Sequence, residues 1–395
     1  MSVERADRER RRPTVAGDDW RTHAEWLAGK LAEPRSRWWA PIAATPRHLL
    51  VPRWWQRGGG SWSLREGADD AEAWMHAAYR RTTSLVTQVG PLHADHASPG
   101  DRPEGRPASS STNPWLVMQM YRFARIHPGH DVLDVATGSG YGCALLARLL
   151  GDAHVTSVDI DPYLVKAAGR RLDALGLRPV LLTADATGPL PGGYDRIVSM
   201  VGMPGVPASW LPALRPGGRL VTTLAGAPIT ITATKDDDGG AWGKVEHATA
   251  GFMAARSGPD HPADTPLPAD TAEGENVRTG RYPVIDLDRS PELAATLFLA
   301  APGIHHGYDE DADGVRTAWM VHADGSWARA TGRRGERPVV HQSGPRRLWE
   351  LLDGIRHDWV ADGYLQVYGA TVRIDPDGTA HFARGRWRAT LPPAG

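Results

Sequence analysis

Short apolar segments alternate with amphipathic segments between residues 116 and 226. Five of the apolar segments have the length and composition of buried strands: DVLDVA (131–136), VTSVDI (155–160), PVLLTAD (179–185), DRIVSMV (195–201) and GRLVTTLA (218–225). Segments with helical spacing, such as residues 141–151 and 162–176, lie between them. Strands that alternate with helices in this way predict a parallel, doubly wound α/β sheet of the Rossmann-like kind.

The patterns on either side of this part are different. Residues 20–32 and 69–81 have helical spacing, with Asp69 or Asp70 as the expected N-cap of the second helix. The stretch 90–114 contains so much Pro, Gly and Ser that we expect an irregular loop, and a loop of that length is usually functional or disordered. We favour a functional loop.

The C-terminal part has the patterns of a small α+β unit. Residues 317–331 predict a hairpin that turns at Asp324 and Gly325, and residues 367–387 predict a second hairpin. Residues 344–363 between them predict an amphipathic helix. The expected organisation is a disordered tail (1–17), a helical region that covers the substrate (18–110), a sheet core (111–234), a loop-rich connector (235–280) and an α+β domain (281–395).

Composition narrows the class of partner. With 45 basic and 46 acidic residues, the chain has no excess charge that would favour nucleic acid or an anionic membrane. The single cysteine, Cys143, excludes an internal disulfide, and the first residues lack the apolar core of a signal peptide. No apolar run approaches the ~20 residues that cross a bilayer. We therefore expect a cytoplasmic protein.

A glycine-rich loop follows the first predicted strand and suggests a ligand. It lacks the lysine and Ser/Thr of a triphosphate-binding loop, which excludes that class. A dinucleotide fingerprint would need a third glycine where Cys143 stands. The acid of the strand, Asp134, followed by Gly138 and Gly140, suits a ligand with a positive ammonium and no pyrophosphate. S-adenosylmethionine (SAM) is such a ligand.

Two further acids end the next two strands. Asp159 closes the second strand about 20 residues after the loop, the spacing at which a carboxylate reaches ribose hydroxyls. Asp185 ends the third strand, where a carboxylate can accept from the adenine amino group. Each acid alone could simply cap the following helix. Together, at the carboxyl edge of one sheet, the three acids favour a nucleoside site.

Ordered blocks in residues 40–226 resemble the protein-L-isoaspartate O-methyltransferase family. They include TPRHLLVP, LVTQVGPLH, SSSTNPWLVMQMY, HPGHDVLDVATGSGYG, VTSVDID and ADATGPLPGGYDRIVSM. The resemblance implies a class I methyltransferase fold in which residues 111–234 bind SAM, and an enzyme that methylates an aspartyl or isoaspartyl carboxylate. The cofactor positions so implied are Asp134, Ala136, Thr137, Gly138, Ser139, Gly140, Asp159, Ile160, Asp185 and Ala186.

The chain also departs from this family. Ala136 stands where the family usually has glycine, and Thr112, with Ser110 and Ser111 beside it, stands where the family has its active-site serine. A C-terminal extension of over a hundred residues is foreign to the housekeeping repair enzymes. It resembles an actinobacterial subgroup, which implies a substrate aspartate in a lanthipeptide, lasso-peptide or graspetide precursor, whose methyl ester closes to aspartimide and can open to isoaspartate.

The chemistry predicts few catalytic groups. A carboxylate with a pKa near 4 is already ionised at neutral pH, so its methylation needs no general base. The main contributions to the rate are then the alignment of the reacting groups and the removal of water from the carboxylate. We predict that Thr112, Ser111 and Ser110 hold the substrate carboxylate, with a helix cap as the alternative role for Thr112. Further substrate contacts are predicted at His93, Met200 and Val201.

Two motifs resemble metal sites without predicting one. HADH (93–96) has suitable residue types but no partner cluster, and DEDADG (309–314) has Met320 where a calcium loop needs glutamate. A polar hairpin turn is the better interpretation of the second. Two other functions stay open: isoaspartyl repair of damaged proteins, and a peptide-binding module without activity.

Overall fold

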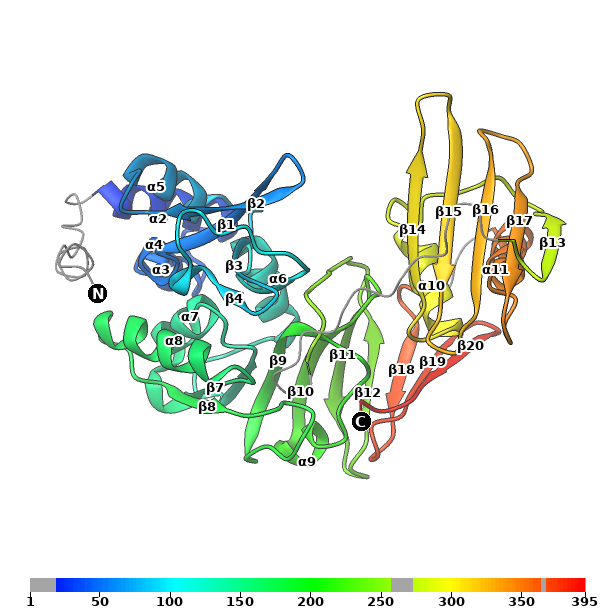
Figure 1. Cartoon of the computed structure of the whole chain (residues 1–395). Helices are drawn as coiled ribbons and strands as arrows, with labels where there is room; N and C mark the ends of the chain where they lie inside the picture. The colour runs from blue at the N-terminus through cyan, green and yellow to red at the C-terminus, as the bar shows by residue number, and fades with distance from the viewer. Residues whose placement is uncertain (1–18, 257–272, 364–366, 395) are drawn as a thin grey trace. The chain divides into compact units, whose positions relative to one another are not determined.

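The computed structural model describes residues 19–256, 273–363 and 367–394 (Figure 1). The chain divides into two compact units between Ala184 and Asp185, within the predicted sheet core. The predicted tail, residues 1–17, lies outside the described residues. Among the described residues, no helix combines the length and apolar character that crossing a bilayer requires.

The first unit begins with short helices. They are α2 (Asp19–Leu31), α3 (Trp39–Ala43), α4 (Arg47–Leu50) and α5 (Ala71–Tyr79). The two predicted helices of this region are confirmed as α2 and α5. The side chain of Asp70 caps α5 by accepting a hydrogen bond of 2.9 Å from the Ala73 amide. This bond satisfies an amide that the first helical turn leaves without a partner.

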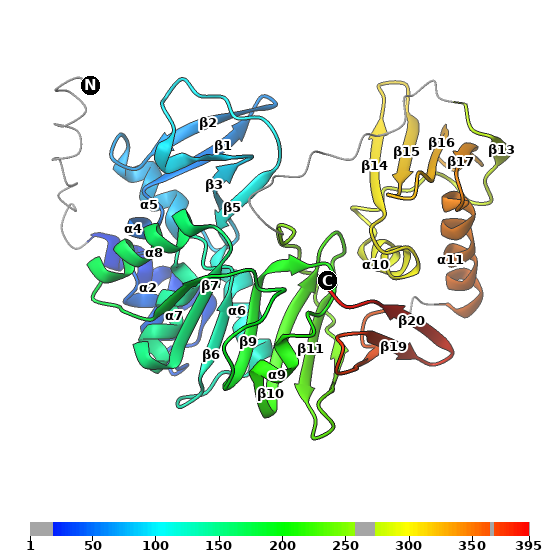
Figure 2. The same ribbon diagram turned by 60° about the horizontal axis from the view of Figure 1, so that its bottom comes forward.

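A five-stranded antiparallel sheet accompanies these helices, and the sequence analysis missed it (Figure 2). Its strands are β1 (Arg53–Gly58), β2 (Ser61–Glu66), β3 (Leu85–Val89), β4 (Leu92–His93) and β5 (Pro107–Ser111), in the order β2-β1-β3-β4 with β5 also on β3. The expected helical region is therefore mixed. The loop 90–114 is also less irregular than expected, because it contains β4, β5 and the short 3-10 helix η1 (Ala94–His96).

The rest of the first unit is the start of the predicted parallel sheet. Strands β6 (Val132–Val135), β7 (Val155–Asp159) and β8 (Val180–Thr183) pair in parallel in that order. Helix α6 (Pro114–Ala124) precedes β6. Helix α7 (Tyr141–Leu150), the 3-10 helix η2 (Asp152–His154) and helix α8 (Pro162–Ala174) lie between the strands in sequence. All four residues of β6 are buried, which explains its continuous apolar character.

The second unit continues the strand and helix pattern. Its first strands, β9 (Tyr194–Met203) and β10 (Leu214–Leu224), are parallel, with α9 (Trp210–Ala213) between them in sequence. Strands β11 (Thr230–Lys235), β12 (Ala241–Val245), β18 (Thr371–Ile374), β19 (Ala380–Arg384) and β20 (Trp387–Leu391) then follow β10 in antiparallel order. The expected loop-rich connector thus contributes β12 to a sheet.

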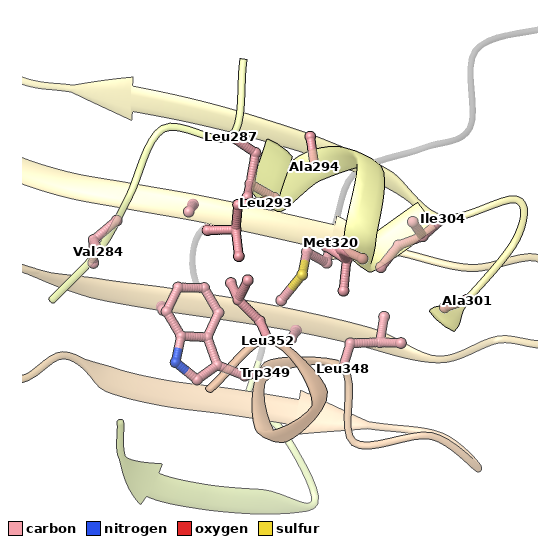
Figure 3. Packing of buried hydrophobic residues seen from close by; sticks show 14 of the residues in the cluster. Val284, Leu287, Leu293, Ala294, Ala301, Ile304, Met320, Leu348, Trp349 and Leu352 are labelled. Carbon is pink, nitrogen blue, oxygen red and sulfur yellow. The ribbon is translucent and has the colours of Figure 1, made fainter. Parts of the chain in front are cut away.

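A separate antiparallel sheet forms the remainder of the second unit. Its order is β13 (Asn276–Thr279), β17 (Val339–Ser343), β16 (Trp327–Arg333), β15 (Val315–Val321) and β14 (His305–Glu310). Helices α10 (Pro291–Ala300) and α11 (Leu348–Asp362) pack against it through a core that includes Met320 and Trp349 (Figure 3). The two predicted hairpins are confirmed as β15–β16 and β18–β19, and the predicted helix as α11.

Candidate active site

The glycine-rich loop joins β6 to α7 by a tightly curved backbone. Ala136 (φ 75°), Gly138 (φ 50°) and Gly140 (φ 85°) all have left-handed conformations. The amides of Ala136 and Thr137 donate to the Val158 carbonyl at 2.8 and 3.1 Å, which fixes the start of the loop on β7. Cys143, at the position of the missing third glycine, is buried in α7.

Ala136 is one of two non-glycine residues with positive φ among the described residues. A left-handed conformation costs an L-residue about 1–2 kcal/mol, whereas glycine adopts it without that penalty. We expect Ala136→Gly to raise the free energy of unfolding by about 1 kcal/mol, measured by urea denaturation. The control Ala147→Gly, inside α7, should lower it by about 1 kcal/mol. A loss of stability in both variants would contradict the assigned strain.

Asp159 connects the end of β7 to the glycine loop. Its carboxylate is 8% exposed and accepts from the Gly138 amide at 2.9 Å and from the Asp161 amide at 3.1 Å. The loop therefore depends on this carboxylate for its position. The contact of Asp159 with ribose hydroxyls stays a prediction. The contact of the neighbouring half-buried Ile160 with the cofactor also stays a prediction.

Asp134 lies beneath the loop in a buried polar network. Its carboxylate is 1% exposed and accepts from the hydroxyls of Ser157 at 2.8 Å and Tyr121 at 3.5 Å. Thr137 extends the network to Ser157 at 2.7 Å. Burial raises the pKa of Asp134 to about 7 against the opposing effect of these hydrogen bonds. The structure gives Asp134 a supporting role, and its contact with a ligand stays a prediction, as does that of the buried Ser139.

Strand β5 runs directly against the glycine loop. A Cβ atom placed on Gly138 would lie 3.1 Å from the Ser110 carbonyl oxygen, so only glycine fits there comfortably. The structure thus brings Ser110, one of the predicted carboxylate-binding residues, to Gly138 of the predicted cofactor loop, 28 residues further along the chain. This contact lies wholly within the first unit.

The three hydroxyl groups at the end of β5 have no hydrogen-bond partners among the described residues. Ser111 is 1% exposed and its hydroxyl is buried, while Ser110 and Thr112 are half-buried. The alternative role of Thr112 as a helix cap is wrong, because Asn113 caps α6 by accepting from the Leu116 amide at 2.9 Å. Buried hydroxyls normally find partners, so the Ser111 hydroxyl is an exception, and the contact of the three hydroxyls with a ligand stays a prediction.

Sequence reasoning missed Arg47 and His48, which are both fully buried in the TPRHLLVP block. Arg47 donates to backbone carbonyls at the end of β5, and His48 Nδ1 lies 2.9 Å from the Tyr79 hydroxyl. Burial, and to a lesser degree the charge of His23, lowers the pKa of His48 to about 4, so it is neutral at pH 7. The available signal for these two residues in the sequence was a charged residue beside the apolar run of the block TPRHLLVP.

The HADH segment is fixed on α8. The Asp95 carboxylate accepts from Tyr163 at 2.9 Å and pairs with Arg171 at 2.6 Å. His93 Nε2 lies 3.1 Å from the carboxylate of Asp161, the N-cap of α8. Burial raises the pKa of Asp161, but the contact with His93, its charge and two helix amides lower it to about 2 overall. In the described part of the chain, no group of three or more His, Cys, Asp or Glu residues forms a metal site.

The predicted residues of the second unit occupy turns and an irregular strand. Asp185 lies two residues beyond the end of β8 rather than on it, and its carboxylate accepts from the amide and hydroxyl of Thr187 at 2.9 and 2.7 Å. The Ala186 carbonyl accepts from the Trp210 indole at 2.8 Å. Half-buried Met200 and Val201 lie where β9 shifts register against β10. Their ligand contacts stay predictions.

Comparison with protein families matches residues 103–250 to the family described as Protein-L-isoaspartate(D-aspartate) O-methyltransferase. The match includes β5, the glycine loop and Asp159. This part of the chain is therefore similar to that family.

Proteins named protein-L-isoaspartate O-methyltransferase are similar in sequence to part of this chain. A protein-L-isoaspartate O-methyltransferase of Pyrococcus horikoshii is 35% identical over 126 residues, which are 31% of this chain and 56% of that protein. One of Azorhizobium caulinodans is 38% identical over 123 residues, which are 30% of this chain and 55% of that protein. The chain therefore spans just over half the length of these relatives.

The likeness of fold extends further than the likeness of sequence. A solved structure named protein-L-isoaspartate O-methyltransferase superposes with a TM-score of 0.51 at 15% identity, and covers 92% of this chain and 99% of that protein. The fold class is thus a mixed α/β protein with a class I methyltransferase sheet and an additional antiparallel sheet. This alignment reaches most of the C-terminal extension, which the family match over residues 103–250 does not.

Proposed function

We propose that this protein is a SAM-dependent carboxyl O-methyltransferase. The observation that carries the proposal is the close approach of β5 to the glycine loop: the Ser110 carbonyl oxygen lies 3.1 Å from a Cβ atom placed on Gly138, and Ser110 is one of the three predicted carboxylate-binding residues. The loop itself fits a nucleoside ligand, since its left-handed residues keep side chains away from the approach and Asp159 fixes Gly138. The family of residues 103–250 supports the same activity.

Within the first unit, the residues that would hold SAM are those of the loop, Gly138 to Gly140, together with Asp159. When bound, SAM would supply a methyl group on a positively charged sulfur. A carboxylate oxygen would form a bond to that methyl carbon as the carbon–sulfur bond breaks, and S-adenosylhomocysteine would leave. The protein would contribute position rather than proton transfer, because the substrate carboxylate is ionised at neutral pH. Ser110, Ser111 and Thr112 would donate hydrogen bonds that orient that carboxylate, and the buried setting would exclude water.

Thr112→Val tests the hydroxyl without changing the shape of the side chain. If Thr112 orients the substrate, kcat/KM for a carboxylate substrate should fall about 10- to 100-fold, because one charge-assisted hydrogen bond is lost. The dissociation constant of S-adenosylhomocysteine, measured by calorimetry, should stay within about twofold. Thr82→Val, at an exposed position before β3, is the matched control. Unchanged kcat/KM in Thr112→Val would contradict the assignment.

The substrate we propose is an aspartate in a ribosomally made, post-translationally modified peptide of the lanthipeptide, lasso-peptide or graspetide type. Attack of the following backbone nitrogen on the methyl ester would release methanol and form aspartimide, and water would open this ring to isoaspartate. The support is the resemblance of the GPRRLW helix and the DGSWA hairpin to an actinobacterial subgroup. In the structure, these segments begin α11 and join β15 to β16.

Repair of isoaspartyl residues is a second candidate, which the family of residues 103–250 favours. Transfer of tritiated methyl groups should be measured to a linear isoaspartyl peptide, a linear aspartyl peptide and a cyclised precursor peptide. Turnover of the cyclised aspartyl peptide to a product that is lighter than the starting peptide by one water molecule supports peptide tailoring. Turnover of the isoaspartyl peptide alone supports repair. Cofactor binding without transfer to any peptide would leave a binding module without activity.

A further inference from the structure

Arg47 lies in the interior of the first unit, directly behind the end of β5. Its side chain is fully buried. One terminal nitrogen, Nη2, donates to the carbonyls of Ser111 at 3.0 Å and Thr112 at 3.2 Å, and Nη1 donates to the Ala78 carbonyl. The guanidinium also lies 5.2 Å from the centre of the Tyr141 ring. Arg47 therefore joins the hydroxyl-bearing strand end to the first residue of α7.

The positive charge of Arg47 has no carboxylate partner among the described residues. Burial lowers the pKa of Arg47 to about 10, while the neighbouring tyrosines 141 and 79 raise it, so the group stays charged at neutral pH. Other arginines of the same unit are compensated: Arg53 pairs with Glu66 at 2.9 Å and Arg171 with Asp95 at 2.6 Å. A buried cation without a counter-charge is costly, and an anion that approaches it removes part of that cost.

Unpartnered polar atoms accompany this charge. The hydroxyls of Ser111 and Tyr141 and the Gln88 carbonyl oxygen are buried and have no hydrogen-bond partners in the described part of the chain. Both hydroxyl groups belong to residues that contact Arg47. Buried polar atoms are usually satisfied in folded proteins, so the hydroxyls of these two Arg47 neighbours retain hydrogen-bonding capacity for a polar group.

We propose that Arg47 is a positioning residue that also selects an ionised substrate carboxylate over a neutral amide. It fixes the Ser111–Thr112 backbone, so that the hydroxyls at this strand end keep one orientation. Its buried charge acts on a carboxylate held by those hydroxyls across a medium that screens it little. This inference rests on the proposed function in one respect, namely that the group bound at Ser110–Thr112 is a carboxylate.

The test compares two synthetic peptides that differ only in one residue, aspartate or asparagine. Their affinities are measured by fluorescence titration in the presence of S-adenosylhomocysteine, for the wild-type protein, Arg47→Met and Arg47→Lys. The wild-type protein should bind the aspartyl peptide about tenfold more tightly than the asparaginyl peptide. Arg47→Met should reduce this ratio to about one, and Arg47→Lys should keep it within threefold of wild type, because the charge remains.

Arg356→Met is the matched control. Arg356 is also buried, donates to the Pro283 carbonyl at 2.7 Å and lies 4.9 Å from the centre of the Tyr282 ring, but it belongs to α11 of the second unit. Its replacement should leave the aspartyl-to-asparaginyl ratio unchanged. If Arg47→Met is too unstable to purify, Arg47→Lys tests the positioning role instead. An unchanged aspartyl-to-asparaginyl ratio together with a kcat lowered about tenfold or more supports that role. An unchanged kcat overturns it.

The outcomes separate this proposal from the proposed function. A wild-type ratio near one, or a ratio near ten that survives in Arg47→Met, overturns the role of Arg47 even if methyl transfer is normal. A ratio that falls from ten to one in Arg47→Met supports it even if no methyl group is transferred. In that second case the proposed methyltransferase activity fails and the carboxylate site stands.

Discussion

Replacing Asp159 by alanine should weaken the binding of S-adenosylhomocysteine about 30-fold, which corresponds to about 2 kcal/mol. The Asp159 carboxylate accepts hydrogen bonds from the amides of Gly138 and Asp161. Its removal leaves two amides without partners, at about 1–3 kcal/mol for a buried unsatisfied group, and frees the loop. If ribose hydroxyls also bind this carboxylate, their hydrogen bonds are lost as well. Isothermal titration calorimetry measures the change directly.

Asp173→Ala is the matched control for this variant. Asp173 lies near the end of α8, is well exposed and pairs with Arg178 on the surface. Its replacement should change the affinity by less than about twofold, because exposed ion pairs contribute little. If Asp159→Ala and the wild-type protein bind S-adenosylhomocysteine with equal affinity, Asp159 is not part of the cofactor site. The glycine loop would then bind a different ligand.

The second large effect should appear in the pH dependence of stability. Asp134 has a pKa of about 7 in the folded protein because it is buried, compared with 3.8 as its ordinary value. Below pH 4 the carboxyl is protonated in both states and has no effect. As the pH rises from 4 to 7, the unfolded state loses this proton and the folded state keeps it, so stability falls. At about 1.4 kcal/mol per pKa unit, the total loss is about 4 kcal/mol.

Asp134→Asn isolates this contribution because its amide stays neutral at every pH. Between pH 5 and 8, the stability of the variant relative to the wild-type protein should rise by about 3 kcal/mol in urea denaturation. Asp173→Asn, at its exposed position, should show no such trend. A constant difference between Asp134→Asn and the wild-type protein across this range would show that Asp134 is ionised in the folded state at pH 5.

The N-terminal sheet illustrates what the sequence did not reveal. Strand β2 is half-exposed along its length, and the hairpin that joins it to β1 turns at Gly59 and Gly60. Short strands with mixed exposure lack a continuous apolar pattern, and the four short helices around them dominate the helical signal. The sheet nevertheless matters for the site, because β3 holds β5, and β5 carries Ser110 to the glycine loop.

Arg47 illustrates a second limit. Its residue type and its place in a helix of four residues predict an exposed side chain. Only the packing of the first unit shows that carbonyls from two distant segments, at Ala78 and at Ser111–Thr112, meet around its guanidinium. Likewise, the sequence predicted Asp134 as a ligand contact, while the structure buries it under hydroxyls of Tyr121 and Ser157.

The sequence by itself determined the parallel strands, their order along the chain, the glycine loop, the end of β7 at Asp159 and the C-terminal hairpins. Each of these is encoded by neighbours within about ten residues, through apolar periodicity, turn glycines and capping acids. Only the tertiary structure decided that β5 lies on the glycine loop, that Asp134 is buried and that Arg47 stands behind Thr112. These features depend on contacts between residues far apart in the chain, and local patterns carry no information about such contacts.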